Sequence, residues 1–261
     1  MFKWSSFDVR SILPRNWSAE ILSVVRQHSR LTILQPPHST SREAPDVRHI
    51  FARGVGPTDL YREVPWLVDL YQSTFRELAE EATGEIVTTG LSIKHTLVLN
   101  VQTADDGRYE CHVDTNPIQG MLYVTSHPDG QGGELVVANT AEARTKEQID
   151  ANCSRVYPQA GHLVFFDARA HPHYVAPLAI SAQVRVAVAM NFYTALCSES
   201  SRPDDLDDYL SGLDPAPTFI DKSLPAVGAE KDSSRERVSF WSDPGPRLQA
   251  TIEPEPHHIS H

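Results

Sequence analysis

The chain has 261 residues, of which 40% are hydrophobic, and a formal net charge of -11 at pH 7. This length suits one domain with elaborations, or one domain plus a tail, and the hydrophobic share is enough for a core. A negative net charge repels phosphate backbones, so no nucleic-acid partner is expected. No segment approaches the roughly 20 apolar residues of a membrane span, so no membrane association is expected either.

Residues 1–10 contain no basic segment followed by an apolar one, and a signal peptide is therefore not expected. The three cysteines, Cys111, Cys153 and Cys197, show no CxxC spacing. Such a set argues against a disulfide framework or a zinc ribbon. We expect a cytoplasmic protein, whose oligomeric state the sequence does not indicate.

Residues 1–84 are predicted to form a mostly helical buttress. Ser18 can cap a helix with apolar residues on one side, and residues 35–58, rich in Pro, Ser and Gly, are predicted to be a loop. A second helix is expected from Pro65 to a C-cap at Gly84. Its apolar positions have helical spacing: Leu67, Leu70, Tyr71, Phe75, Leu78 and Ala82.

Residues 85–198 change character, with short runs of Val, Leu, Ile and Tyr separated by turn residues. This pattern predicts a mainly β domain, either a sandwich, a barrel or a jelly roll. The expected strands are 92–102, 121–125, 134–138, 161–166, 174–177 and 184–193.

Residues 199–261 are predicted to be an acidic and then Pro-rich C-terminal arm, partly disordered. One short helix is expected at 203–213. Phe240 and Trp241 are the most evident anchors of this arm.

The segment around His112 and Asp114 carries the first chemical signal. If it is extended, residues two apart point to the same side, so His112 and Asp114 face one point. One imidazole and one carboxylate make two thirds of a metal-binding face. His171 or His173, just after the strand expected at 161–166, can supply the third ligand. Two histidines and one carboxylate leave positions open for a co-substrate and O2, as in non-haem Fe(II) oxygenases.

Arg185 lies in the apolar strand expected at 184–193. An arginine there is costly unless it is paired, and its planar guanidinium can bind a carboxylate in bidentate fashion. The distal carboxylate of 2-oxoglutarate would be a suitable partner. The alternative is that Arg185 pairs with an acidic residue of the protein.

The stretch 98–193 resembles the 2-oxoglutarate/Fe(II) dioxygenases of the prolyl-hydroxylase-like branch, including compact amino-acid hydroxylases and halogenases. The resemblance rests on several motifs in order rather than on a single His-x-Asp. They are Tyr109 with His112-Val113-Asp114, Met-Leu-Tyr-Val-Thr at 121–125, Gly-Gly-Glu-Leu at 132–135, Pro-x-x-Gly-x-Leu-Val-Phe-Phe at 158–166, His-x-Val-x-Pro at 173–177, and Arg185.

This resemblance implies a double-stranded β-helix, also called a jelly roll, that uses Fe(II), 2-oxoglutarate and O2 and releases succinate and CO2. It implies that His112, Asp114 and His173 are the metal ligands. It also implies that Arg185 and Tyr123 hold the co-substrate, although the interval between His173 and Arg185 is slightly longer than in close relatives. Related halogenases have Gly or Ala at the position of Asp114, so the carboxylate favours hydroxylation.

The substrate is expected to be a small molecule, a free amino acid or a metabolite derived from one. The alternatives are a protein hydroxylase of prolyl type and a metal-binding jelly-roll module without catalysis. Four polar residues near the motifs are either substrate contacts or solvated loop positions: Glu110, Asn116, His127 and Asn191.

Overall fold

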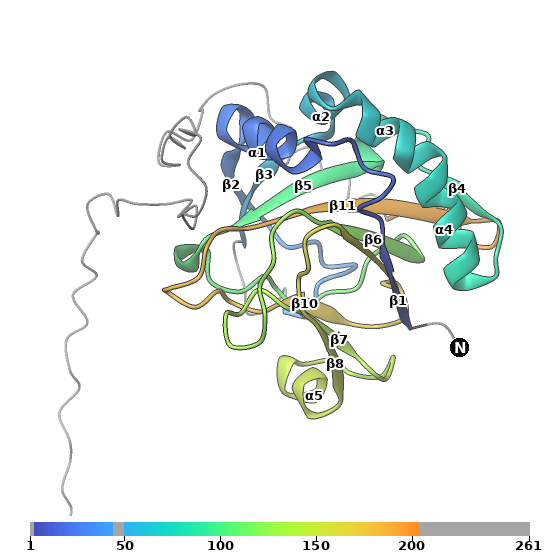
Figure 1. Ribbon diagram of the computed structural model, residues 1–261. Helices are drawn as coiled ribbons and strands as arrows, with labels where there is room; N and C mark the ends of the chain where they lie inside the picture. Colours follow the sequence, from blue (N-terminus) through green and yellow to red (C-terminus); the bar gives the residue numbers. More distant parts are fainter. Residues whose placement is uncertain (1–2, 44–49, 204–261) are drawn as a thin grey trace, which may run out of the picture. The chain divides into compact units, whose positions relative to one another are not determined.

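The computed structural model describes residues 3–43 and 50–203. All of them belong to the first of the two units of the chain, Met1–Asp221. A large and a small antiparallel β-sheet form the centre of this unit, and helices α1 to α4 lie along the outer side of the large sheet (Figure 1).

The large sheet has eight strands in the order β1-β9-β6-β11-β5-β3-β2, and β4 pairs with the far end of β11. All strand pairs in it are antiparallel. Its strands are β1 (Trp4–Asp8), β2 (Arg30–Leu34), β3 (Ile50–Val55), β4 (Val87–Thr89), β5 (Leu97–Gln102), β6 (Ile118–Tyr123), β9 (His162–Asp167) and β11 (Arg185–Thr194).

The small sheet has the order β10-β7-β8, with β7 (Leu135–Ala138), β8 (Cys153–Val156) and β10 (His173–Val175). One hydrophobic cluster joins the two sheets. It contains Tyr123, Val164, Phe166 and Ala187 of the large sheet and Leu135, Val137 and Val156 of the small sheet. Two facing antiparallel sheets with a shared core are the jelly-roll arrangement that the sequence predicts.

The helices are short. They are α1 (Trp17–His28), α2 (Pro57–Glu63), α3 (Pro65–Gln72), α4 (Thr74–Thr83) and α5 (Lys146–Ala151), with 3-10 turns at Ile93–His95, Ala104–Asp106 and Glu199–Ser201. In Figure 1, α5 lies beside β7 and β8 of the small sheet. None of the described helices is long and apolar enough to cross a membrane.

The two helices predicted before residue 85 are confirmed, with two corrections. The N-cap of α1 is Asn16 rather than Ser18. The single helix predicted from Pro65 is broken at Ser73, whose φ and ψ of -117° and -96° are not helical. Gly84 ends α4 as predicted, in the left-handed conformation with φ of 72°.

The prediction of a loop over residues 35–58 is wrong, because β3 occupies Ile50–Val55 and α2 begins at Pro57. β3 is stabilised by backbone pairing to β2 and to β5, which a local pattern does not reveal. Gly54 allows the close approach, since a Cβ atom there would lie 2.2 Å from the carbonyl oxygen of Leu99. The strand predicted at 92–102 begins instead with the 3-10 turn Ile93–His95.

The stretch 1–84 therefore supplies three strands to the large sheet in addition to its helices. Except for Pro203, the helix predicted at 203–213 lies outside the described residues. The rest of the predicted arm, with Phe240 and Trp241, does so too.

Candidate metal centre and co-substrate pocket

Backbone hydrogen bonds fix the segment that carries His112 and Asp114. The amide of His112 donates to the carbonyl of His173 (3.0 Å), and the amide of His173 donates back to the carbonyl of His112 (2.8 Å). The amide of Asp114 donates to the carbonyl of Ala168 (2.9 Å). On its other side, His112 forms a bridge with Ser41. Residues distant in sequence are thus joined through their main chains, which sets the positions of the side chains.

The side chains of His112, Asp114 and His173 converge. Their ligand atoms all lie within 4.8 Å of one another. The Nε2 atom of His112 is 3.4 Å from Oδ1 of Asp114, and the Nε2 atom of His173 is 3.7 Å from Oδ2 of the same carboxylate. Two imidazole nitrogens and one carboxylate on one side of a point form a donor set suited to a divalent transition metal.

Each histidine is oriented by a hydrogen bond at its other ring nitrogen. Nδ1 of His112 donates to the carbonyl of Glu110 (2.9 Å), and Nδ1 of His173 donates to the carbonyl of His171 (3.1 Å). Because a carbonyl oxygen only accepts, Nδ1 carries a proton in both rings. In the neutral ring, Nε2 then presents a lone pair toward Asp114, as a metal ligand requires.

The three groups strongly perturb one another. Burial disfavours the charged form of His112, but the hydrogen bond and charge of Asp114 outweigh it and raise the pKa of His112 to about 9. Burial and the charge of His112 lower the pKa of His173 to about 4. Burial acts to raise the pKa of Asp114, yet the two imidazoles lower it overall. The site thus attracts positive charge, which a metal cation would supply.

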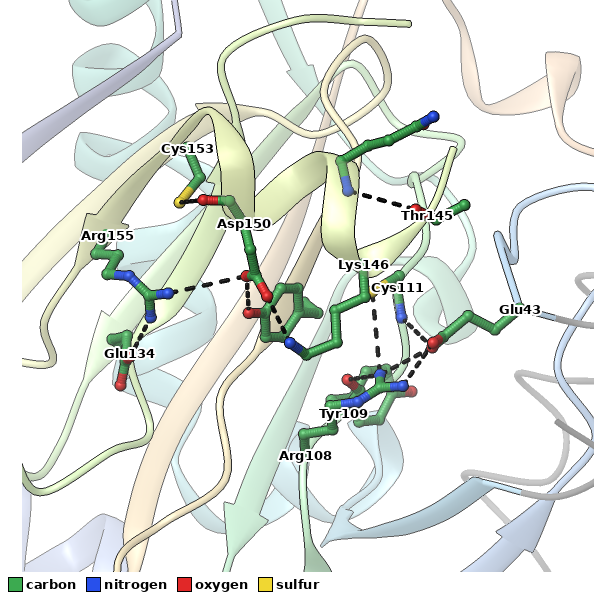
Figure 2. Close-up of polar contacts among 12 residues, drawn as sticks. Glu43, Arg108, Tyr109, Cys111, Glu134, Thr145, Lys146, Asp150, Cys153 and Arg155 are labelled. Carbon is green, nitrogen blue, oxygen red and sulfur yellow. Dashed lines mark hydrogen bonds and ion pairs between the residues drawn. The ribbon is translucent and has the colours of Figure 1, made fainter. Parts of the chain in front are cut away.

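Two polar networks support the elements that carry the histidines (Figure 2). In the first, the carboxylate of Glu43 accepts from both terminal nitrogens of Arg108 and from the amide of Cys111 (2.8 Å), next to His112. In the second, Asp150 of α5 accepts from the hydroxyl of Tyr174 on β10, next to His173.

The triad faces a cavity of about 190 Å³ between the sheets. Apolar residues of its wall include Val98, Met121, Phe166 and Val175, while Asn100, Gln119, Asn191 and Tyr193 add polar groups. Part of this wall is the inner side of β11, whose alternate residues point inward. They are Arg185, Ala187, Ala189, Asn191 and Tyr193.

Arg185 lies in this cavity and is 2% exposed. Its Nε atom donates to the carbonyl of Gly133 (2.7 Å), and its guanidinium carbon lies 5.5 Å from the centre of the Tyr123 ring. Among the described residues, no carboxylate forms an ion pair with Arg185. Its Nη2 atom and the hydroxyl of Tyr123 are both buried without a hydrogen-bond partner in the described part of the chain. Burial lowers the pKa of Arg185.

The four polar residues near the motifs separate into two groups. Glu110, Asn116 and Asn191 line the cavity. His127 does not line it, although it is fully buried. Burial, followed by the charge of Arg185, lowers the pKa of His127 to about 4, so its ring is neutral near pH 7. It therefore adds no second positive charge next to Arg185.

His171 is not one of the three converging residues. Its Nδ1 atom donates to the carbonyl of Ala138 (2.9 Å), and it lies outside the cavity lining. Of the two histidines that the sequence offers as a third ligand, the structure brings His173 to the other two groups.

Sequence reasoning missed an ion pair in the cavity wall. Nε of Arg53 lies 3.3 Å from Oδ2 of Asp106, and both residues line the cavity. Arg53 lies within the predicted loop and Asp106 lies between the strands predicted at 92–102 and 121–125, so neither carries a local signal. Arg108, which also lines the cavity, was missed for the same reason.

Comparison with known proteins agrees with this geometry. Residues 98–193 match the family model described as the 2OG-Fe(II) oxygenase superfamily. That stretch contains the three converging residues as well as Tyr123 and Arg185. No match was found among curated proteins.

Solved structures with the same fold include a 2OG-Fe(II) oxygenase family oxidoreductase from Burkholderia pseudomallei. It is 15% identical, with 73% of this chain and 85% of that chain covered and a TM-score of 0.51. AviO1 from Streptomyces viridochromogenes Tue57 is 10% identical over 75% and 91% of the two chains, with a TM-score of 0.53. HygX from Streptomyces hygroscopicus, solved with nickel, 2-oxoglutarate and hygromycin B bound, is 11% identical over 76% and 85%, with a TM-score of 0.51.

Residues 98–193, the segment that carries the converging residues, thus match the 2OG-Fe(II) oxygenase superfamily, and the solved structures share the fold of the chain. The double-stranded β-helix, the match and the His-Asp-His group together indicate a 2-oxoglutarate-dependent dioxygenase that uses Fe(II). This match favours an enzyme over the metal-binding module without catalysis.

Proposed function

We propose that His112, Asp114 and His173 hold the Fe(II) ion, and that Arg185 and Tyr123 bind the distal carboxylate of 2-oxoglutarate. The observation that carries this proposal is the pair of orphaned buried polar groups beside the triad. Nη2 of Arg185 and the hydroxyl of Tyr123 are buried without a partner among the described residues. A buried guanidinium is costly unless an anion pairs with it, and a carboxylate would accept hydrogen bonds from both groups.

The donor set fits Fe(II) equally well. Both imidazoles are oriented by hydrogen bonds at Nδ1, and the carboxylate of Asp114 lies between their Nε2 atoms. When bound, the iron and 2-oxoglutarate supply oxidative chemistry that consumes O2, releases succinate and CO2, and hydroxylates an unactivated C–H bond of the substrate.

The residues of the chain position the reactants and limit the access of water. Met121, Phe166 and Val175 give the cavity an apolar wall near the triad. This wall excludes water and directs a C–H bond toward the metal face. With a metal bound, the carboxylate of Asp114 would occupy the position that a halogenase leaves open for chloride, which supports hydroxylation as the outcome.

We propose further that the substrate is a small molecule, a free amino acid or a metabolite derived from one. The cavity volume of about 190 Å³ is below the roughly 300–1,000 Å³ of pockets for drug-sized ligands, which favours a compact substrate. Carboxylate, guanidinium and carboxamide groups line it, including Asp106, Arg53 and Asn116. Because Asp106 and Arg53 pair with each other, such a lining suits a polar molecule without fixing its charge.

Succinate formation tests this function. The purified protein would receive Fe(II), ascorbate and 2-oxoglutarate, with each free amino acid of a panel and with several proline-containing peptides. Stimulation by a free amino acid would support the proposal. Stimulation by peptides alone would favour the protein hydroxylase instead. Absence of any succinate above background, with iron bound, would contradict the small-molecule proposal.

Asp114→Ala serves as the negative variant in this assay. Loss of a group that only orients a metal ligand typically costs roughly 10–100-fold in metal affinity or activity. Loss of the ligand itself is expected to reduce iron binding and succinate formation by more than that. Asp129→Ala is the matched control, because Asp129 is exposed and lies outside the cavity lining. It is expected to retain both iron and activity.

A further inference from the structure

Glu110 is a buried carboxylate in the wall of the cavity. It is 5% exposed and lies two residues before His112. Its Oε2 atom accepts a hydrogen bond from the hydroxyl of Ser41 at 2.6 Å. Within the described part of the chain, no Lys, Arg or His forms an ion pair with this carboxylate. The hydroxyl of Ser41 is thus its described hydrogen-bond donor, and the charges of His112 and Arg108 act on it without forming an ion pair.

The other carboxylates of the cavity are differently placed. Three acidic residues line it: Asp106, Glu110 and Asp114. Asp106 is paired with Arg53 at 3.3 Å, and Asp114 lies between the imidazoles of the triad. Glu110 is therefore the carboxylate of this lining that no described cation pairs with.

The neighbouring arginine is already engaged. Arg108 donates through both terminal nitrogens to the two carboxylate oxygens of Glu43, as Figure 2 shows. Both terminal nitrogens of Arg108 are thus engaged with Glu43, which does not line the cavity, and Arg108 forms no ion pair with Glu110. A molecule that occupies the cavity can supply a cation that pairs directly with Glu110.

A structural role alone does not account for a carboxylate at this position. The group that orients His112 is the main-chain carbonyl of Glu110, which any residue would provide. A neutral amide of the same size would also accept the hydrogen bond from Ser41. Burial of a carboxylate without a cation is costly, whereas a bound ammonium group would offset that cost.

We propose that Glu110 binds the positively charged amino group of the substrate and so selects compounds with a free amine. This inference rests on the proposed function, since the cavity must also hold the metal and 2-oxoglutarate. Because Glu110 is two residues from His112, an amine held there places the adjoining carbon atoms beside the triad. Substrates whose nitrogen is acylated lack the charge and are rejected.

Equilibrium binding tests the proposal without turnover. Protein loaded with Ni(II) in place of Fe(II), together with 2-oxoglutarate, would be titrated by calorimetry with each common L-amino acid and with its N-acetyl derivative. At least one free amino acid is expected to bind, and its N-acetyl derivative to bind at least about tenfold more weakly, since a hydrogen bond to a charged group is lost.

Glu110→Gln removes the charge but keeps the shape and the acceptor for Ser41. It is expected to weaken binding of the free amino acid by roughly 10- to 100-fold and to leave the affinity for 2-oxoglutarate unchanged. Ser41→Ala is the matched variant, because it removes the hydrogen bond and retains the charge. It is expected to weaken binding only about two- to fivefold.

Three results would overturn the inference: equal binding of the N-acetyl derivative, an unchanged affinity in Glu110→Gln, or no binding by any free amino acid. Titration of Ni(II) and 2-oxoglutarate into the same samples separates this failure from failure of the proposed function. If both still bind, the oxygenase site stands and only the role of Glu110 is wrong. If neither binds, the proposed function fails as well.

Discussion

At the scale of single residues, Arg185 combines its proposed binding role with a cost to stability. It is 2% exposed, and its Nη2 atom has no partner in the described part of the chain. Burying a charged guanidinium without an anionic partner has a high free-energy cost. The buried guanidinium of Arg185 is therefore expected to bind an anionic ligand.

Arg185→Met is expected to raise the Kd for 2-oxoglutarate by at least about 100-fold, the usual effect of removing one partner of a buried ion pair. The free energy of unfolding without ligand should change by no more than about 2 kcal/mol, because the lost desolvation cost offsets the lost hydrogen bond to Gly133. Calorimetry and urea titration measure the two quantities. Arg155→Met is the control, since Arg155 pairs with Glu134 outside the cavity lining. A strongly destabilised Arg185→Met with normal affinity would contradict the assignment.

Tyr123→Phe should separate binding from stability in the same way. The Tyr123 hydroxyl is buried without a described partner, so its removal should leave the free energy of unfolding equal or raise it by about 1 kcal/mol. The Kd for 2-oxoglutarate should rise about tenfold, because a hydrogen bond to a charged group is lost. Tyr174→Phe should do the opposite. Its hydroxyl donates to Asp150, so stability should fall by about 1–2 kcal/mol with the affinity unchanged.

The converging residues could be predicted from sequence because their motifs lie on two short segments with a fixed order. His112, Asp114 and His173 were named in advance, and the structure brings them together. Arg53 and Asp106 could not be named, because their pairing depends on β3 lying beside β5. His127 was grouped with possible substrate contacts, since the sequence does not reveal that it lies outside the cavity lining.

At the scale of elements, the turn before β7 contacts Arg185, the proposed ligand of 2-oxoglutarate. Gly132 and Gly133 both have positive φ values, 74° and 75°, and the carbonyl of Gly133 accepts from Arg185. A Cβ atom on Gly133 would lie 2.8 Å from Cδ2 of Leu178 and 2.9 Å from Cδ of Arg185. The conformation of the turn and the placement of Arg185 are therefore linked.

Gly133→Ala is expected to weaken 2-oxoglutarate binding about tenfold or more, because the added methyl group displaces Arg185. In addition, alanine at a positive φ costs about 1 kcal/mol of backbone strain. Gly130→Ala is the matched control. It has a φ of 85° but nothing within 4 Å of the added Cβ atom, so it carries the strain without the contact. Equal affinities in the two variants would show that the contact with Arg185 has no effect. Calorimetric titration with 2-oxoglutarate supplies the comparison.

The central strands were predictable where both faces are covered. β11 is buried along almost its whole length, which produces the continuous apolar run from residue 184. β2 and β3 lie toward one edge of the large sheet, and apolar residues stand at their exposed positions: Leu31, Ile33 and Phe51. Their pairing depends on partners distant in sequence, so no local pattern predicts them.

At the scale of the whole molecule, contacts over long sequence intervals connect the cavity wall to later parts of the chain. Glu199 accepts from the amides of Leu91 and Ser92 and lies 2.6 Å from Nδ1 of His95. His95 in turn lies near the cavity wall, since its carbonyl accepts from Asn191 at 3.3 Å. The turn Glu199–Ser201 is thereby attached to the beginning of β5 and to β11.

This attachment predicts a dependence of stability on pH. Burial acts to raise the pKa of Glu199, but hydrogen bonds from His95, Leu91 and Ser92 outweigh it and lower the pKa. A carboxylate with a lowered folded pKa stabilises the fold above its unfolded pKa of about 4.3. That contribution is lost as the pH falls through the folded value.

Glu199→Gln is therefore expected to lower the free energy of unfolding by about 1–2 kcal/mol at pH 7, because charge-assisted hydrogen bonds are replaced by neutral ones. The difference from the unaltered protein should shrink steadily between about pH 5 and pH 3. Urea titrations at several pH values measure it. Glu77→Gln is the control, since that side chain is 65% exposed, and it should show almost no difference at any pH. A difference for Glu199→Gln that persisted at the lowest pH would mean that packing, rather than the carboxylate charge, attaches this turn to the sheet.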